Sequence, residues 1–347
     1  MIDIHVHLRD GKQRYKETIE HAFSVAAKCG YTTLYEMPNT DPPLTTKEAI
    51  LDRIKLALIS QKKWNITYGF YGGVTSDEKQ LSTIVDLYNN IDQMIALKMF
   101  AGHSTGNMGL VEKKEQQKVY ELLTQKNYRG VIAVHCEKES EMDHSLFDLS
   151  DAHSHQRSRP PQAEIESIKD QIELIKQTNF PGHLHICHIS TQKAIELVIQ
   201  AKKEGLKISC GATAHHALLD ESYIQKSNHL LKMNPPLRSS QDREFVFHAL
   251  LDGSIDVIES DHAPHSLEDK AKGASGIVGF RGTLILIERL REEGISEEVL
   301  FNLLGNRANE IFAQKCPITI ASNEALSQMI KDIRDEYPYD PFEVIRP

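Results

Sequence analysis

The sequence predicts a (β/α)8 barrel, and three features of the 347-residue chain agree on that fold. Short apolar or β-branched runs alternate with longer segments of helical period, which is typical of parallel strands joined by crossover helices. Eight such pairs can be marked along the chain, and eight pairs suffice to close a barrel. Polar residues able to bind metal follow several runs, at the strand ends where barrel enzymes carry their active sites.

The eight expected strands are the short apolar runs. We place them at Ile2–Leu8, Thr32–Met37, Asn65–Tyr71, Met94–Phe100, Gly130–His135, His183–His188, Lys207–Gly211 and Asp256–Ser260. Candidate helices lie between them, near residues 15–29, 46–61, 77–90, 113–126, 163–178, 191–204 and 241–252, with a last one near 283–293.

Two segments fall outside this alternation. Met142–Pro161 is polar and without a clear period, and we expect a long loop that acts as a lid or binding segment. The tail after Cys316 contains one expected helix near Asn323–Arg334 and should pack on the barrel exterior. We therefore predict a catalytic barrel over residues 1–315 and a C-terminal tail over 316–347.

The composition is that of an ordinary globular protein, with 40% hydrophobic and 26% charged residues. A net charge of -9 gives no basic surface for nucleic acid, and no apolar run is long enough to cross a membrane. The five cysteines are scattered and form no CxxC pair, which favours reduced thiols. Since the first ten residues do not resemble a signal peptide, we expect a cytoplasmic protein that acts on small molecules.

The strongest local signal is the pair His5 and His7 on the first expected strand. Residues i and i+2 of a strand point the same way, so both imidazoles can reach one metal ion. Two histidines on a solvated strand face are the alternative. The position of the pair before a charged turn, Arg9-Asp10, favours the metal site.

Four more polar residues stand at the ends of other expected strands: Lys98, His135, His188 and Asp261. Each has an ordinary explanation, since a single histidine there can be structural and a single aspartate can cap the next helix. The carboxyl ends of strands 4, 5, 6 and 8 nevertheless converge with that of strand 1 on one barrel mouth. All six side chains are therefore expected to meet.

Lys98 is unusual because an ammonium in a strand buried on both faces is costly to desolvate. Burial and nearby cations lower the pKa of a lysine, and the neutral amine can add carbon dioxide to become a carbamate. Such an anion has two oxygens and can bridge two metal ions. A lysine that extends to the barrel rim is the alternative.

Five motifs together resemble the dihydroorotase family: HVHLRD (5–10), MPNTDPP (37–43), HICHIS (185–190), MNPPLR (233–238) and SDHAPH (260–265). The HxH pair and the aspartate of strand 8 are shared across the amidohydrolase superfamily. HLRD, MPNT and NPPLR are more particular to the dihydroorotase and allantoinase branch. The resemblance covers most of the chain.

The resemblance implies two Zn2+ ions. The first would be held by His5, His7 and Asp261 and the second by His135 and His188, with carboxylated Lys98 as the bridge. It also implies that Arg9, Asn39 and His265 bind the substrate carboxylate, and that Asn234 contacts the pyrimidine ring. Asp261 would be the catalytic base, and residues 273–282 (GASGIVGFRG) a glycine-rich loop near the ligand. The implied reaction is the reversible cyclisation of N-carbamoyl-L-aspartate to dihydroorotate.

Other residues near the motifs are expected not to bind metal. Strand alternation should turn His262 away from Asp261, and it should make Cys136 and Cys187 part of the core. Supporting roles beside the ligands are expected for His185, His215, His216 and His262.

Several alternatives stay open at this level. Another cyclic amidase, an allantoinase or dihydropyrimidinase, would share all six ligands, and an inactive scaffold for aspartate transcarbamoylase would have lost some. Some dihydroorotases use aspartate at the bridge, so one or two metal ions stay open. The sequence does not decide whether the chain forms a homodimer or associates with aspartate transcarbamoylase. Because HxH starts at residue 5, we expect an accessory β-sandwich to be absent or greatly reduced.

Overall fold

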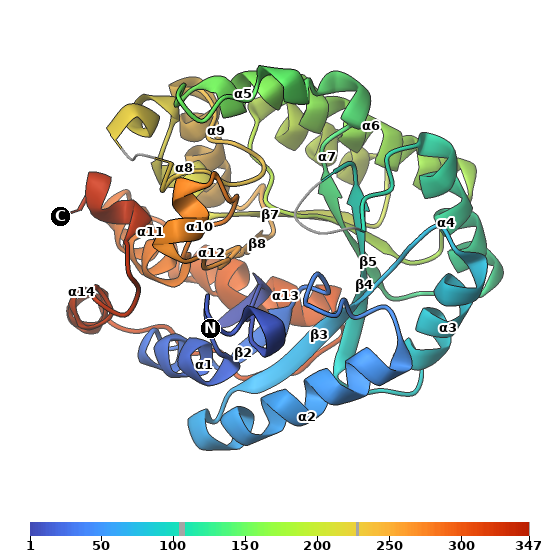
Figure 1. Ribbon diagram of the computed structural model, residues 1–347, viewed down its shortest axis with the longest axis horizontal. Coiled ribbons are helices and arrows are strands. Elements are labelled where there is room, and N and C mark those ends of the chain that lie inside the picture. The colour runs from blue at the N-terminus through green and yellow to red at the C-terminus, as the bar shows by residue number, and fades with distance from the viewer. Residues whose placement is uncertain (104–107, 227–228, 347) are drawn as a thin grey trace.

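The computed structural model describes residues 1–103, 108–226 and 229–346, and its centre is a ring of parallel strands surrounded by helices (Figure 1). All eight strands pair in sequence order, β1 to β8, in parallel. An isolated bridge between Val6 and His262 joins the last strand to the first. The predicted (β/α)8 barrel is therefore confirmed.

The observed strands lie close to the expected runs. They are β1 Ile2–Val6, β2 Thr33–Glu36, β3 Thr67–Gly73, β4 Met94–Ala101, β5 Val131–Cys136, β6 His183–Ile186, β7 Ile208–Ala212 and β8 Val257–Ile258. The last strand is shorter than expected. After Glu259, Ser260 N donates to the Asp3 carboxylate (3.1 Å) instead of a neighbouring strand. Among the described residues no strand lies outside this sheet, and so none forms an accessory β-sandwich.

The outer ring consists mainly of eight helices, all close to the expected ranges: α1 Ile19–Lys28, α2 Lys47–Trp64, α3 Glu78–Tyr88, α4 Lys113–Gln125, α6 Pro161–Gln177, α7 Gln192–Lys203, α9 Ser240–Leu251 and α11 Phe280–Glu292. Several begin at a residue whose side chain caps the first turn, as Thr18 Oγ1 does for His21 N. Within the described chain, no helix is long and apolar enough to cross a membrane.

Shorter elements fill the connections. They are the helices α5 Ser154–Ser158, α8 Ala214–Leu218, α10 Leu267–Ala271, α12 Glu297–Phe301, α13 Arg307–Ile311 and α14 Asn323–Asp332, the π-helix Asn302–Asn306, and 3-10 turns at Gly11–Gln13, Glu139–Glu141, His144–Leu146, Glu221–Lys226 and Pro341–Val344. The segment 142–161 therefore contains short helical turns as well as loop.

The end of the barrel opposite the strand carboxyl ends is filled by aromatic side chains. Phe312, which follows α13, packs its ring 5.6 Å from that of Tyr35 and 6.0 Å from that of Tyr71. Both tyrosines are buried, and Phe312 is only 4% exposed. A residue from the C-terminal third of the chain thus completes the interior packing of strands from the first third.

The C-terminal tail packs on the outside of the barrel, with α14 against α11 (Figure 1). It also reaches further inward than the sequence suggests. The hydroxyl of Tyr337 donates to the buried carboxylate of Glu17 (2.7 Å), which also accepts from His262 Nε2 (3.0 Å). The proposed division at residue 315 stays a prediction.

Replacing Phe312 by alanine should lower the free energy of unfolding by about 3–5 kcal/mol, since a buried aromatic ring leaves a cavity that its rigid neighbours cannot fill. Urea denaturation followed by circular dichroism measures the loss. The matched control is Tyr15→Ala, because Tyr15 is 63% exposed and its removal should change stability by less than about 0.5 kcal/mol. Equal losses in both variants would contradict this description of the core.

Candidate metal centre and anion pocket

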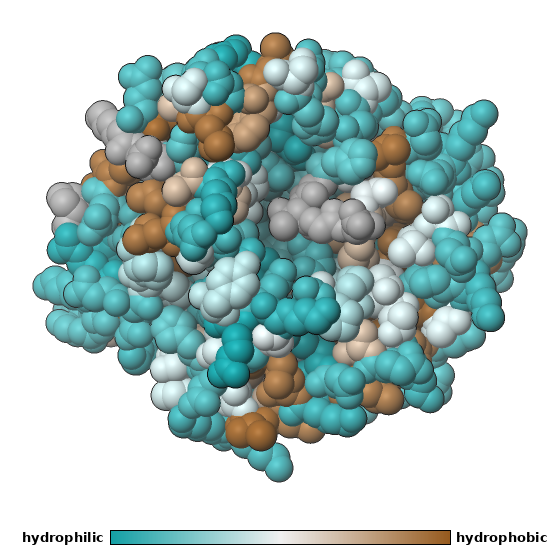
Figure 2. Space-filling view, viewed as in Figure 1, coloured by the Kyte–Doolittle hydropathy of each residue, from teal (hydrophilic) through white to brown (hydrophobic). Residues whose placement is uncertain are grey.

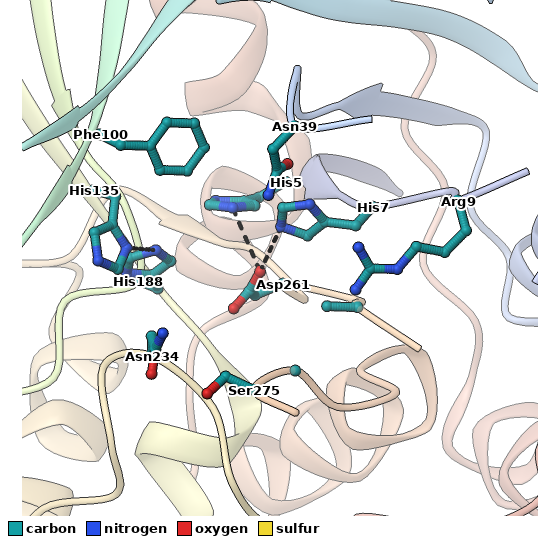
Figure 3. Close-up of a pocket in the computed structure, with 12 residues that line it drawn as sticks. His5, His7, Arg9, Asn39, Phe100, His135, His188, Asn234, Asp261 and Ser275 are labelled. Carbon is teal, nitrogen blue, oxygen red and sulfur yellow. Dashed lines mark hydrogen bonds and ion pairs between the residues drawn. The ribbon is translucent and has the colours of Figure 1, made fainter. Parts of the chain in front are cut away.

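The carboxyl ends of the strands surround a polar pocket at one end of the barrel (Figure 3). Its lining residues are His5, His7, Arg9, Asn39, Phe100, His135, His188, Asn234, Asp261, Ala263, Ser275 and Gly276. Nearly all of the predicted site residues are in this set. Figure 2 shows the same face of the molecule as Figure 1, hollowed near its centre and largely hydrophilic around the hollow.

One half of the pocket is a cluster of two histidines and an aspartate. Asp261 Oδ1 lies 3.4 Å from His5 Nε2 and 3.1 Å from His7 Nε2. Ligand atoms of a tetrahedral zinc ion with Zn–N bonds near 2.0–2.1 Å are about 3.3 Å apart. These three side chains therefore have the spacing of a common cation site, as the sequence predicted.

The other half contains His135 and His188, whose facing nitrogens, Nδ1 and Nε2, are 3.1 Å apart. His135 Nε2 donates to the buried carboxylate of Glu137 (2.9 Å), which leaves Nδ1 with its lone pair toward the pocket. Glu137 is in turn held by the guanidinium of Arg159. This carboxylate fixes the tautomer of His135 that can bind a metal ion.

Burial keeps most of these imidazoles neutral, which a metal ligand requires. It lowers the pKa of His7 to about 4 and holds the pKa values of His135 and His188 below the ordinary value. Asp261 behaves oppositely. Burial would raise its pKa, but the charge of His5 and the hydrogen bond from His7 outweigh burial and keep the carboxylate ionised.

Lys98 is fully buried on β4, and its Nζ lies 2.9 Å from Sγ of Cys187. Cys187 in turn shares a cluster of potential ligands with His5 and Glu259. The lysine therefore stands beside the histidine pair and does not extend to the barrel rim. It is not among the residues that line the pocket.

Glu259 is a site residue that the sequence analysis did not identify. Its buried carboxylate accepts from His5 Nδ1 (3.2 Å) and, through its other oxygen, from the backbone N–H of His188. Burial alone would lower the pKa of His5, but the charge of Glu259 raises it to about 10, so this ring is a more basic ligand. A glutamate directly after the apolar pair Val257-Ile258, and two residues before Asp261, was the available signal.

Cys187 lies in the core as expected, but the alternation argument behind that expectation does not hold. Alternation predicted that Cys187 and His188 face opposite sides, yet Cys187 contacts Lys98 in the barrel interior while His188 lines the pocket. The reason is that β6 ends at Ile186 and His188 has a left-handed backbone (φ 36°), so the period of two no longer applies. Cys136 also lies in the core as expected.

The four histidines that were not expected to bind metal are also absent from the pocket lining. The ring of His262 points away from Asp261, as alternation predicted, and stacks on Phe280 at 3.9 Å. His216 contacts Thr213 and the carbonyl of Pro235, and His185 Nδ1 contacts Ser209.

Arg9, Asn39 and Asn234 line the pocket, and His265 lies beside Arg9. Arg9 is 3% exposed, its Nε donates to the carbonyl of Pro264 (3.1 Å), and its Nη2 lies 3.2 Å from His265 Nε2. Among the described residues no carboxylate lies within ion-pair distance of this guanidinium. The guanidinium of Arg9 and the side-chain amides of Asn39 and Asn234 thus border a space that suits an anion.

The glycine-rich segment approaches the pocket through its backbone, as expected. Gly276 has φ 136°, and a Cβ on it would lie 2.7 Å from the carbonyl oxygen of Ala263. Left-handed backbone also occurs at three non-glycine residues of the site: Arg9 (φ 56°), His188 (φ 36°) and Asp261 (φ 46°). Such conformations cost about 1–3 kcal/mol each and persist where the surrounding structure enforces them, as is common at functional sites.

Comparison with known proteins gives a consistent result. A family profile described as "Dihydro-orotase-like" matches residues 1–194. A dihydroorotase of Lactobacillus johnsonii is 34% identical over 305 residues, which is 87% of this chain and 69% of that protein. A dihydroorotase of Bacillus cytotoxicus is 30% identical over 351 residues, which is 98% of this chain and 78% of that protein.

Two solved structures illustrate the similarity of the fold. The L-hydantoinase (dihydropyrimidinase) of Arthrobacter aurescens has a TM-score of 0.81 and 25% identity, covering 90% of this chain and 70% of its own. The dihydroorotase of Campylobacter jejuni has a TM-score of 0.70 and 21% identity, covering 91% and 84%. The barrel is therefore common to cyclic amidases with different named substrates.

Glu259→Gln should weaken binding of the tighter zinc ion by about 10–100-fold, because the amide no longer makes His5 more basic. Competition with a chromophoric chelator measures the affinity without any turnover assay. Asp220→Asn serves as the control, since Asp220 is also buried but contacts Ser222 and Arg243, and none of these three residues lines the metal pocket. Unchanged zinc affinity in Glu259→Gln would show that the carboxylate only fills space.

Proposed function

The chain belongs to the dihydroorotase family of metal-dependent amidohydrolases, and from this membership we propose that it interconverts N-carbamoyl-L-aspartate and (S)-dihydroorotate for pyrimidine biosynthesis. The ring closes or opens at an amide bond. The partners that the proposal requires are these small molecules only; dimer formation and association with aspartate transcarbamoylase are not part of it.

The observation that carries the choice of substrate is the unpaired guanidinium of Arg9 beside the metal ligands. A buried cation whose nearest carboxylates, Glu17 and Asp261, form no direct ion pair with it favours a ligand that brings a carboxylate. Dihydroorotate carries such a group on its ring, whereas dihydropyrimidines and hydantoins do not require one. Asn39 and His265 would add neutral donors beside the fork, and Asn234 would contact the ring.

The metal proposed is Zn2+, in two sites, because imidazole nitrogens with one carboxylate are a typical zinc ligand set. His5, His7 and Asp261 would hold the first ion, and His135 and His188 the second. Lys98, carboxylated on Nζ, would bridge the two. Its full burial on β4, with Nζ 2.9 Å from Cys187 Sγ, supports a role inside the site and not at the barrel rim.

Bound zinc would supply Lewis-acid activation of water and of the scissile carbonyl. Side chains of the protein would then transfer the proton and orient the substrate. Asp261 would take the proton from the attacking water at its carboxylate and pass it to the leaving ring nitrogen, first as base and then as acid. Arg9 would hold the ring by its carboxylate so that the amide faces Asp261. In the biosynthetic direction the same proton transfers run in reverse.

Allantoinase and dihydropyrimidinase activities are the alternatives that the same ligand set permits. Turnover of dihydroorotate, allantoin and dihydrouracil by the zinc-loaded enzyme tests the proposal directly. The expected result is a clear preference for dihydroorotate. Equal or faster turnover of either neutral ring would contradict the assignment of Arg9 as the specificity residue.

Lys98→Ala should bind about one zinc ion per chain in place of two and lose most of its activity, because the second site keeps only His135 and His188. Elemental analysis of protein purified without chelators measures the metal. Short carboxylates in the buffer should partly restore the ion, while Lys98→Arg should not respond to them, since its permanent charge fills the bridge position. A fully active Lys98→Ala variant with two ions would exclude the bridge.

Arg9→Lys should weaken transition-state binding of dihydroorotate by about 1.5–3 kcal/mol, although the charge is kept, because lysine cannot offer a bidentate fork. Steady-state kinetics on the zinc-loaded variant gives the change in kcat/KM. Metal content should stay unchanged, which separates this effect from damage to the metal centre. Wild-type kcat/KM would remove Arg9 from the site.

A further inference from the structure

A second hollow adjoins the metal pocket. We call it the antechamber, and its lining residues are His144, Phe147, His155, Ser158, Arg159, Lys232, Asn234 and Ser275. Its volume is about 280 Å³. It shares Asn234 and Ser275 with the metal pocket, so the two spaces are neighbours across these side chains.

Lys232 is the charged group of the antechamber that has no counter-ion. Its Nζ donates to Ser275 Oγ (2.7 Å) and lies 4.7 Å from the centre of the Phe147 ring. Across residues 1–103, 108–226 and 229–346, no carboxylate approaches Nζ within ion-pair distance. Neither contact neutralises the ammonium, although the side chain is half-buried.

The second cation of the antechamber does not change this balance. Arg159 is 5% exposed, and its Nε and Nη2 bind the carboxylate of Glu137. That carboxylate also accepts from His135, so its charge is already shared. The antechamber as a whole therefore has a net positive charge.

The walls provide further features of a binding site. The amide oxygen of Asn234 is buried without a hydrogen-bond partner, in the wall between the two spaces. His155 is fixed by the carbonyl of Met233 (2.9 Å), and the Phe147 ring packs edge-on against it (6.0 Å between centres, 78°). The ammonium of Lys232 suits a small anion, and the unsatisfied oxygen of Asn234 suits a ligand that also carries an N–H donor.

We propose that the antechamber is a second anion-binding site, in which Lys232 binds a carboxylate of a small dicarboxylate next to the metal pocket. The identity of the natural ligand as a ureido dicarboxylate rests on the proposed function, whereas the binding of an anion does not. A positive entrance raises the local concentration of anionic ligands and speeds their capture. Lys232 thus binds the anionic ligand as it enters, and Arg9 holds the ring of the ligand in the metal pocket.

The two cations can be tested separately because Arg9 lines only the metal pocket and Lys232 only the antechamber. The probe is radiolabelled malonate, counted per chain by equilibrium dialysis against the zinc-loaded enzyme. Lys232→Met should bind one malonate fewer than the wild type. Lys126→Met is the matched control, since Lys126 is also half-buried but pairs with Asp86 at the end of α4.

Kinetics gives a second readout. In Lys232→Met, kcat/KM should fall roughly tenfold, the scale of one hydrogen bond to a charged group. The factor must be the same for ring opening and ring closure, because a variant cannot change the equilibrium constant. Saturated kcat should change little, since Lys232 touches none of the metal ligands.

The outcomes separate the two proposals. Unchanged malonate stoichiometry in Lys232→Met overturns the second anion site, even if the enzyme turns over dihydroorotate as proposed. Loss of one malonate in an enzyme that does not accept dihydroorotate supports the anion site and refutes the proposed substrate. Should Lys232→Met not fold, bromide soaked into wild-type crystals decides the question: a peak beside Lys232 Nζ supports the site, and a peak only at Arg9 overturns it.

Discussion

The hydrogen bond from His7 N to the carbonyl of His262 (2.8 Å) is the contact on which the site depends. It closes the barrel between the last strand and the first, and it joins His7, a proposed metal ligand, to His262, which directly follows Asp261 in the sequence. Without it, Asp261 would not meet His5 and His7, which lie more than 250 positions earlier in the chain. The ring of His262 is itself held by Glu17 and by Gly279 N (3.2 Å). The contact that closes the barrel therefore also brings Asp261 to His5 and His7.

In each half of the candidate metal centre, a buried carboxylate orients one histidine. Glu259 accepts from His5 and Glu137 accepts from His135, so in each half one histidine has a fixed tautomer. A buried carboxylate is costly to desolvate, and each is compensated in its own way. Arg159 stands behind Glu137, while Glu259 also accepts the backbone N–H of His188. The second contact connects the two halves through one side chain.

Cations and metal ligands are separated in space around this centre. Arg9 stands beyond His7, on the opposite side of the pocket from His135 (Figure 3). Lys232 stands behind Asn234 and Ser275, in the antechamber. Among the described residues, neither Arg9 nor Lys232 hydrogen-bonds to a predicted metal-binding histidine. The buried Lys270, whose Nζ donates to the carbonyls of Lys232 and Gly276, holds the two segments that form this wall.

The sequence by itself determined the barrel, because the alternation of apolar runs with segments of helical period can be read from neighbouring residues alone. Each apolar run becomes a strand that is buried between the barrel interior and the helices. The sequence also determined the six candidate ligands, since strand ends of a parallel barrel must converge. It could not reveal how Glu259 orients His5, how Cys187 comes to face Lys98, or how Tyr337 reaches Glu17 from the tail. The positions of these side chains depend on where strands end and on left-handed backbone at residues such as His188. Only the tertiary structure decides such contacts, because the residues that meet lie far apart in the chain and nothing in the sequence indicates that they are neighbours in space.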